Sequence, residues 1–264
     1  MATDVLSLSH REKEAWSQFL QAEACLKESR THDAIHLYED ACRALEESYS
    51  VMHWRTCYAM DRLAQALASE SRFAAAKEIF IRALEAAEQV EYHLRATNEQ
   101  KTSVLSFSFG FADLACNCAH IEEYLSKYVS GESHLRKALG MLKDQLDQNI
   151  TQIATVEGGI LYPESISTKY SSVMMELAGL LCRHSSASEA QHLYEQVIAY
   201  QETTAQMNLH IVAKAQASLI EIHKQLNNYG SATTIARRHL QNVERLFGPH
   251  HEGILLYLYM ISHC

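Results

Sequence analysis

Small and large apolar residues recur along the chain with the spacing of paired antiparallel helices. The clearest copy lies in residues 174–197, where two triplets follow one another: Leu177, Ala178 and Leu181, then Ala190, Tyr194 and Val197. Residues at i, i+4 and i+7 share one helix face, and a small side chain at a crossing lets two helix axes approach closely. The pattern therefore predicts two helices joined through small residues.

The same pattern occurs five times, so we expect a repeat protein. In three copies a small residue is followed twelve positions later by alanine: Ala22 by Ala34, Ala64 by Ala76, and Ala178 by Ala190. In the third copy Ala115 precedes Gly131 by sixteen positions, which predicts four extra residues in the helix–helix turn. In the fifth copy Ile220 and His239 are larger than the pattern prefers. One pair cannot bury its own apolar faces, so stacked neighbours must complete the core.

This pattern resembles the tetratricopeptide repeat, whose signature joins Leu-Ala on the first helix to an Ala, aromatic, Ala series on the second. The step is 42 residues from Ala22 to Ala64 and again from Ala178 to Ile220, as in kinesin light chains. The segment 246–252, LFGPHHE, is also similar to the linker between repeats there. The resemblance implies an all-α fold, a right-handed α-α superhelix of about five helix pairs plus a C-terminal helix.

We expect one solenoid over residues 9–264. Its repeats should span about 15–50, 57–95, 108–157, 171–205 and 213–247. A helix and loop insertion at 140–172 separates the third and fourth copies, because Gly158-Gly159 and Pro163 interrupt the helical pattern there. A terminal helix is expected at 251–263. Its apolar run 254–261 either docks on the fifth repeat or is covered by a further segment or a partner.

Composition supports helices and narrows the partners. Only 2 Pro and 9 Gly occur in 264 residues, which is too few breakers for a many-stranded fold. A net charge of −9 argues against a nucleic-acid partner. No apolar run approaches the roughly 20 residues of a transmembrane helix. With seven cysteines and no secretory core, we expect a cytoplasmic or cytoskeletal protein, or a mitochondrial one if a presequence has been removed.

No motif for catalysis is visible, so we expect neither an enzyme nor a cofactor. Gly-rich phosphate loops, Gly-x-Ser-x-Gly elbows and His-Glu-x-x-His pairs do not occur. The nearest approach to a metal site is Cys116, Cys118 and His120. On a helix Cys118 would point about 200° away from Cys116, so the sequence predicts no metal site there.

Binding of a protein or peptide is the better prediction. The tetratricopeptide resemblance implies that residues flanking the small position of each first helix line a concave groove. The expected groove residues are Tyr58, Asp61, Arg62, Gln65, Phe109, Ala112, Cys116, Met175, Gly179, Arg183, Lys214 and Glu221. Trp16, Phe19 and Glu23 of the first copy, and Asp113 and His120 of the third, occupy similar positions.

These residues suggest a non-enzymatic scaffold within a larger assembly. A mainly apolar helix or peptide would lie against Phe109, Ala112 and Cys116, with Arg62 or Arg183 at one edge. The alternative is that several of these side chains are packed inside the superhelix and touch no partner. The basic residue and Asn that hold a C-terminal carboxylate in co-chaperones are absent.

A second function is left open by the spacing of the repeats. The order of steps, with Tyr58-Ala59-Met60 before Leu63-Ala64, is similar to the tetratricopeptide assembly factor of the mitochondrial cytochrome bc1 complex. That resemblance implies a respiratory-complex assembly factor.

Overall fold

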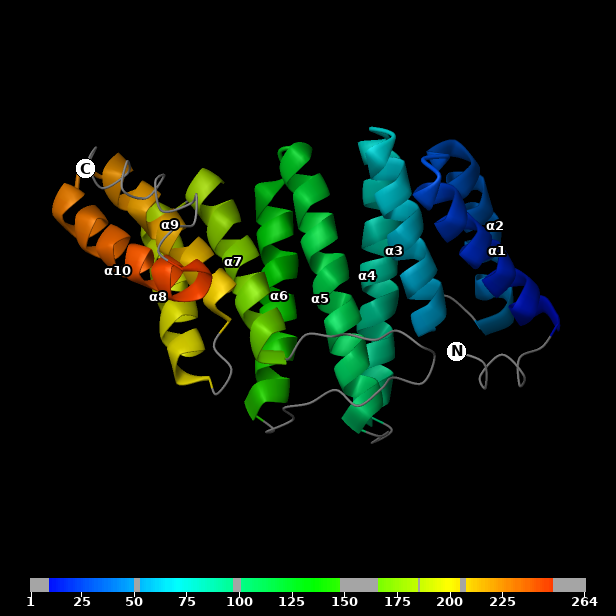
Figure 1. The fold of residues 1–264 in the computed structure, drawn as a ribbon. Coiled ribbons are helices and arrows are strands. Elements are labelled where there is room, and N and C mark those ends of the chain that lie inside the picture. The colour runs from blue at the N-terminus through cyan, green and yellow to red at the C-terminus, as the bar shows by residue number, and fades with distance from the viewer. Residues whose placement is uncertain are drawn as a thin grey trace. The chain divides into compact units, whose positions relative to one another are not determined.

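The computed structural model describes residues 10–49, 53–96, 101–147, 166–184, 186–204 and 208–248. Within these ranges the chain forms ten α-helices and no strand, which confirms the predicted all-α class with five helix pairs (Figure 1). The helices are α1 (His10–Lys27), α2 (Thr31–Tyr49), α3 (Trp54–Ser69), α4 (Phe73–Ala96), α5 (Lys101–Tyr124), α6 (Tyr128–Asp147), α7 (Ile166–His184), α8 (Ala187–Thr203), α9 (Leu209–Gln225) and α10 (Tyr229–Phe247).

The chain divides into two compact units, Met1–Ile166 and Ser167–Cys264. The first unit holds the pairs α1/α2, α3/α4 and α5/α6, and the second holds α7/α8 and α9/α10. A single solenoid over 9–264 stays a prediction. The terminal helix expected at 251–263, and residues 148–165 of the expected insertion, lie outside the described residues.

The same tight turn closes four of the helix pairs. One residue in each of these turns has positive φ: Ser29 (59°), Ser71 (61°), Ser126 (60°) and Asn227 (55°). The amide of the next residue donates to the carbonyl five positions back, at 2.7–2.9 Å. This is the Schellman arrangement, which satisfies carbonyls that the helix end leaves open. The turn therefore fixes the register of the two helices that it joins.

That register corrects the prediction for the third pair. A Cβ on Gly131 would lie 3.2 Å from Cα and 3.3 Å from O of Ala119, so Gly131 crosses Ala119 and not Ala115. Ala119 precedes Gly131 by twelve residues, as in the other pairs. α5 ends at Tyr124 and α6 begins at Tyr128, so the four extra residues are absent from the turn. The prediction was wrong because Ala115, also fully buried, lies one helical turn earlier and fits the same spacing.

The core follows the predicted pattern of small and large residues. Four residues after the crossing position of the second helix, a large side chain fills the groove in four pairs: Tyr38, Phe80, Leu135 and Tyr194, all buried. In the fifth pair Ile220 packs with Ala232 and Ala236, so the larger crossing residue is accommodated by smaller neighbours. This packing orients the first helices, whose other faces carry the candidate site.

Candidate functional site

Polar side chains of α1, α3 and α5 form one connected network in the first unit. Arg62 binds Glu23 in a bidentate pair, with Nε to Oε1 at 2.6 Å and Nη2 to Oε2 at 3.0 Å. Arg62 Nη1 donates to Gln65 Oε1 at 3.0 Å, and Gln65 Nε2 donates to Asp61 Oδ2 at 2.8 Å. Asn117 Nδ2 completes the chain by donating to Asp61 Oδ1 at 3.0 Å. The network thus joins the first helices of three successive pairs.

The two carboxylates of this network are shifted in opposite directions. Burial alone would raise the pKa of Glu23, but hydrogen bonds from Arg62 and from the Tyr38 hydroxyl hold it below its ordinary value. Burial raises the pKa of Asp61, against the lowering effect of its bonds from Asn117 and Gln65. The side chains of Glu23 and Arg62 are each 26% exposed, so this pair reaches the surface, whereas Asp61 is buried.

Aromatic side chains border the network between α1 and α3. Trp16 stacks on Phe19 with ring centroids 4.8 Å apart, and Phe19 lies 5.4 Å from Tyr58. The guanidinium of Arg55 lies 5.9 Å from the ring of Trp16 and 5.1 Å from that of Trp54, within cation–π range. Phe19 is buried, whereas Trp16 and Tyr58 are half-buried. The network therefore has a partly exposed aromatic edge.

The corrected register changes which residues of α5 belong to this face. Counted from Ala119, the positions that match Tyr58, Asp61, Arg62 and Gln65 are Asp113, Cys116, Asn117 and His120. Ala112 is fully buried, and its place in the groove stays a prediction. Phe109 lies in α5, ten residues before Ala119, and its side chain is outside the described residues. These four positions of α5 carry mostly polar side chains, and the apolar groove that the sequence predicts stays a prediction.

Sequence reasoning missed Asn117, although it occupies the position of Arg62 one repeat later. Its role depends on the contact with Asp61, 56 residues earlier in the chain. Counting back seven residues from the turn at Ser126 would have placed Ala119 at the crossing and Asn117 at the position that matches Arg62.

Five predicted groove residues lie in the second unit. Met175, Gly179 and Arg183 are spaced by four on α7 and so share a face. A Cβ on Gly179 would come within 3.1 Å of Arg183 Nη1, so the guanidinium lies over the glycine. Lys214 and Glu221 are exposed on α9. That these residues continue the groove of the first unit stays a prediction.

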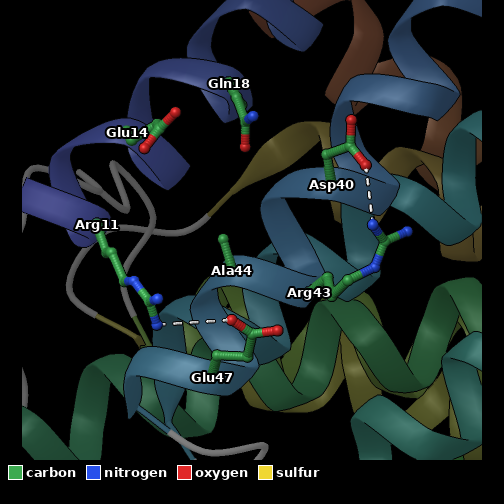
Figure 2. A pocket seen from close by; sticks show the side chains of 7 residues that line it. All are labelled: Arg11, Glu14, Gln18, Asp40, Arg43, Ala44 and Glu47. Atoms are coloured by element: carbon green, nitrogen blue, oxygen red, sulfur yellow. Dashed lines mark ion pairs between the residues drawn. The ribbon is translucent and has the colours of Figure 1, made fainter.

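A shallow pocket of about 300 Å³ lies between α1 and α2 (Figure 2). It is lined by Arg11, Glu14, Gln18, Asp40, Arg43, Ala44 and Glu47. Arg11 pairs with Glu47 at 3.9 Å and Arg43 with Asp40 at 3.4 Å, as the dashed lines show. All four side chains are more than half exposed, and such pairs contribute little stability. The charges in this pocket are mixed, so it offers no single-sign surface to a charged partner.

The cysteines and histidine that the sequence places nearest to a metal pattern are not brought together. Cys118 is fully buried toward α6, whereas Cys116 is half-buried and His120 is exposed. In the described part of the chain, no helix combines the length and the apolar character that crossing a membrane requires.

No protein-family model and no curated protein matches the sequence. Several solved structures are similar in fold. The TPR-like repeats of a kinesin light chain from Podosopora anserina match with a TM-score of 0.63 and 15% identity, over 91% of this chain and 99% of that one. BtubC from P. vanneervenii matches with a TM-score of 0.63 and 18% identity, over 95% and 93%. YrrB, described as a TPR protein with an unusual peptide-binding site, matches with a TM-score of 0.51 and 13% identity, over 93% and 90%.

These similarities define the class of fold. The chain has the helix-pair fold of tetratricopeptide repeat proteins, including the kinesin-light-chain type that the 42-residue step implied. The resemblance to the assembly factor of the cytochrome bc1 complex stays a prediction.

Proposed function

We propose that the protein is a non-enzymatic interaction scaffold that holds an extended segment of a partner protein along α1, α3 and α5 of its first unit. The observation that carries the proposal is the network from Glu23 to Asn117, in which three successive first helices present hydrogen-bonding side chains on one face. The residues of α7 and α9 would extend this surface if the repeats stack as the sequence predicts.

The network holds its polar groups in fixed positions. Arg62 carries five N–H donors and the amides of Gln65 and Asn117 each carry two donors and one acceptor oxygen, more than their contacts within the network use. A segment in extended conformation presents alternating N–H and C=O groups that such side chains can bind. Because these side chains are already ordered by one another, binding would cost little additional side-chain entropy.

The polar character of the face argues for an extended polar segment in place of the apolar helix. The apolar expectation depended on Phe109, Ala112 and Cys116. In the register of Ala119 and Gly131, the α5 residues Asp113, Asn117 and His120 match α3 residues that we expect in the groove, which supports a polar segment. The half-buried rings of Trp16 and Tyr58 would receive a single large side chain of the partner at the α1/α3 edge. The peptide-binding site of the structurally similar YrrB is in keeping with this proposal.

Site-specific photocrosslinking tests this function. A photoreactive amino acid replaces either the exposed His120 on α5 or the exposed Arg136 on α6, whose ion pair with Glu132 lies on a second helix. Extended peptides selected on the purified chain should crosslink at position 120 and not at 136. Crosslinking at position 136 alone would reject the groove.

An affinity measurement gives the second readout. Replacing Gln65 by Ala removes groups from the centre of the network and should weaken the selected peptides about 5–10-fold, the loss of one to two hydrogen bonds. Arg136→Ala is the matched control and should leave affinity unchanged. If Gln65→Ala binds as tightly as the wild type, the network does not hold the partner.

A further inference from the structure

The third helix pair brings together a cysteine, a glutamate and a histidine. The ligating atoms of Cys118, Glu122 and His134 all lie within 4.8 Å of one another, with His134 Nε2 at 3.6 Å from Glu122 Oε2. Cys118 and the side chain of Glu122 are fully buried, and that of His134 is 22% exposed. This cluster lies between α5 and α6, and none of its residues takes part in the network from Glu23 to Asn117.

The other helix pairs show that the fold does not require polar groups at these positions. In the register set by Ala119 and Gly131, His134 occupies a position that is aliphatic in the other four pairs: Leu37, Ile79, Leu193 and Ile235. Glu122 occupies a position held elsewhere by Cys25, Leu67, Leu181 and His223. Cys118 stands where three of the pairs have leucine: Leu63, Leu177 and Leu219. Among the five described pairs, only the third places three metal-ligating side chains there.

The two oxygens of the Glu122 carboxylate have different surroundings. Oε1 accepts a hydrogen bond from Ser130 Oγ at 2.6 Å and lies 3.2 Å from Lys77 Nζ. Oε2 is buried and has no hydrogen-bond partner, since His134 Nε2 lies beyond hydrogen-bond distance. A buried carboxylate oxygen in a native protein is normally satisfied, and leaving one unpaired costs about 1–3 kcal/mol or more. Oε2 lies 3.6 Å from His134 Nε2 and can accept a further cationic or hydrogen-bonding partner.

We propose that Cys118 Sγ, Glu122 Oε2 and His134 Nε2 bind a Zn²⁺ ion. A thiolate, an imidazole and a carboxylate together form a donor set that suits zinc better than it suits magnesium or calcium. Tetrahedral coordination at zinc bond lengths places a nitrogen and an oxygen ligand about 3.3–3.5 Å apart, and the 3.6 Å between His134 Nε2 and Glu122 Oε2 is close to that range. Cys118 Sγ lies within 4.8 Å of the other two ligand atoms, so a side-chain rotation of about 1 Å would have to complete the site. Three protein ligands leave a fourth position for water.

The surroundings of the cluster fit this role. Ser130 and Lys77 bind Oε1 and so orient Oε2 toward the metal position, as outer-shell partners do in zinc sites. Zinc binding breaks the S–H bond, forms the S–Zn bond and releases one proton to solvent. The thiolate then supplies one negative charge to the ion, and the charge of the Glu122 carboxylate is shared between the ion and Lys77.

Cobalt substitution tests the proposal on the purified full chain. Co²⁺ added to the wild type should bind one to one and give a thiolate-to-cobalt charge-transfer band, which Zn²⁺ then abolishes. Cys118→Ala should lose the band, and His134→Leu, which installs the side chain of the first and fourth pairs, should change it. Each variant should weaken zinc affinity by at least about 10–100-fold, since loss of an outer-shell partner alone has that effect.

The nearby residues provide the control. Cys116→Ala combined with His120→Gln removes the other cysteine and histidine of this stretch and should leave the band and the zinc affinity unchanged. Circular dichroism checks whether each variant is folded. If Cys118→Ala does not fold, the zinc affinity of His134→Leu tests the proposal. Absence of a thiolate band in the wild type would overturn the proposal. So would a band that persists in Cys118→Ala, or zinc affinity in His134→Leu equal to that of the wild type.

Discussion

Two glycines of α6 allow the register of the third helix pair to be tested within one helix. Gly131 faces Ala119 across the helix crossing, whereas a Cβ on Gly140 would meet nothing within 4 Å. Both lie inside the helix, where replacing Gly by Ala should gain about 0.5–1 kcal/mol from backbone entropy and helix propensity. The two substitutions therefore share the propensity gain and differ in the crossing.

The geometry gives the size of the difference. At Gly131 the new methyl would sit 3.2 Å from the Cα and 3.3 Å from the carbonyl oxygen of Ala119, and a backbone cannot turn aside as a side chain can. Overpacking of this kind costs about 1–3 kcal/mol. Gly140→Ala should thus raise the free energy of unfolding by about 0.5–1 kcal/mol, and Gly131→Ala should change it by about zero to −2.5 kcal/mol after the propensity gain.

Urea unfolding of the full chain, followed by circular dichroism, measures both variants against the wild type. The midpoint should rise for Gly140→Ala and stay level or fall for Gly131→Ala, with the slope unchanged. If the two variants are stabilised equally, α5 and α6 do not cross at Ala119 and Gly131. The assignment of Asn117 and His120 to the groove face would then fail as well.

Three further outcomes are expected. Arg62→Ala should lower the free energy of unfolding by about 1–3 kcal/mol, because it removes a bidentate pair to the partly buried Glu23, whereas Arg136→Ala, at an exposed pair, should change it by less than about 0.5 kcal/mol. Burial lowers the pKa of His53 in the folded chain to about 4, and the ring nitrogen of His53 caps α3. The unfolded chain therefore takes up the proton first as the pH falls, so the contribution of His53 to the free energy of unfolding should be full above pH 6.5 and decline between pH 6.5 and 4. His53→Asn should abolish this pH dependence while retaining the cap. Burial raises the pKa of Cys57 to about 12, so at pH 8 iodoacetamide should modify this thiol only after unfolding, as peptide mass analysis with and without urea would show.

The helix pairs could be predicted because their determinants are local. Ala22 and Ala34, or Ala178 and Ala190, are twelve residues apart, and a turn of two or three residues makes that distance sufficient to bring two faces together. The large side chains that follow them in the second helix fill the groove beside the crossing. Spacing of this kind is visible in one sequence without knowledge of the neighbouring helices.

The register of the third pair could not be fixed by that spacing alone. Ala115 and Ala119 are both small and both fully buried, and a shift by one helical turn keeps the same face. The turn itself carried a usable signal, because Glu28-Ser29-Arg30 and Glu70-Ser71-Arg72 are matched by Leu125-Ser126-Lys127. Each serine adopts positive φ seven residues after the crossing. Alignment by the turns in place of the alanines would have given Ala119.

Contacts between different helix pairs could not be predicted from the sequence, because they depend on how the pairs pack against one another. Glu23 and Arg62 are 39 residues apart, and their bidentate bond depends on how α3 packs against α1. Each residue was expected on a groove face, and that expectation stays a prediction. What the spacing could not show is that these side chains bind one another.

In the third pair, polar side chains stand on two sides of α5 at positions that are mostly apolar or differently occupied in the other pairs. On one side Asn117 binds Asp61 of α3, and on another Cys118 and Glu122 meet His134 of α6. Adjacent residues on a helix are about 100° apart, so these contacts hold α5 from two directions at one level. An ion between α5 and α6 would therefore fix the rotation of α5 about its axis, and the other face of α5 carries Asn117 toward the proposed partner. The third pair is thus the one in which the proposed groove and the proposed zinc site are connected through a single helix.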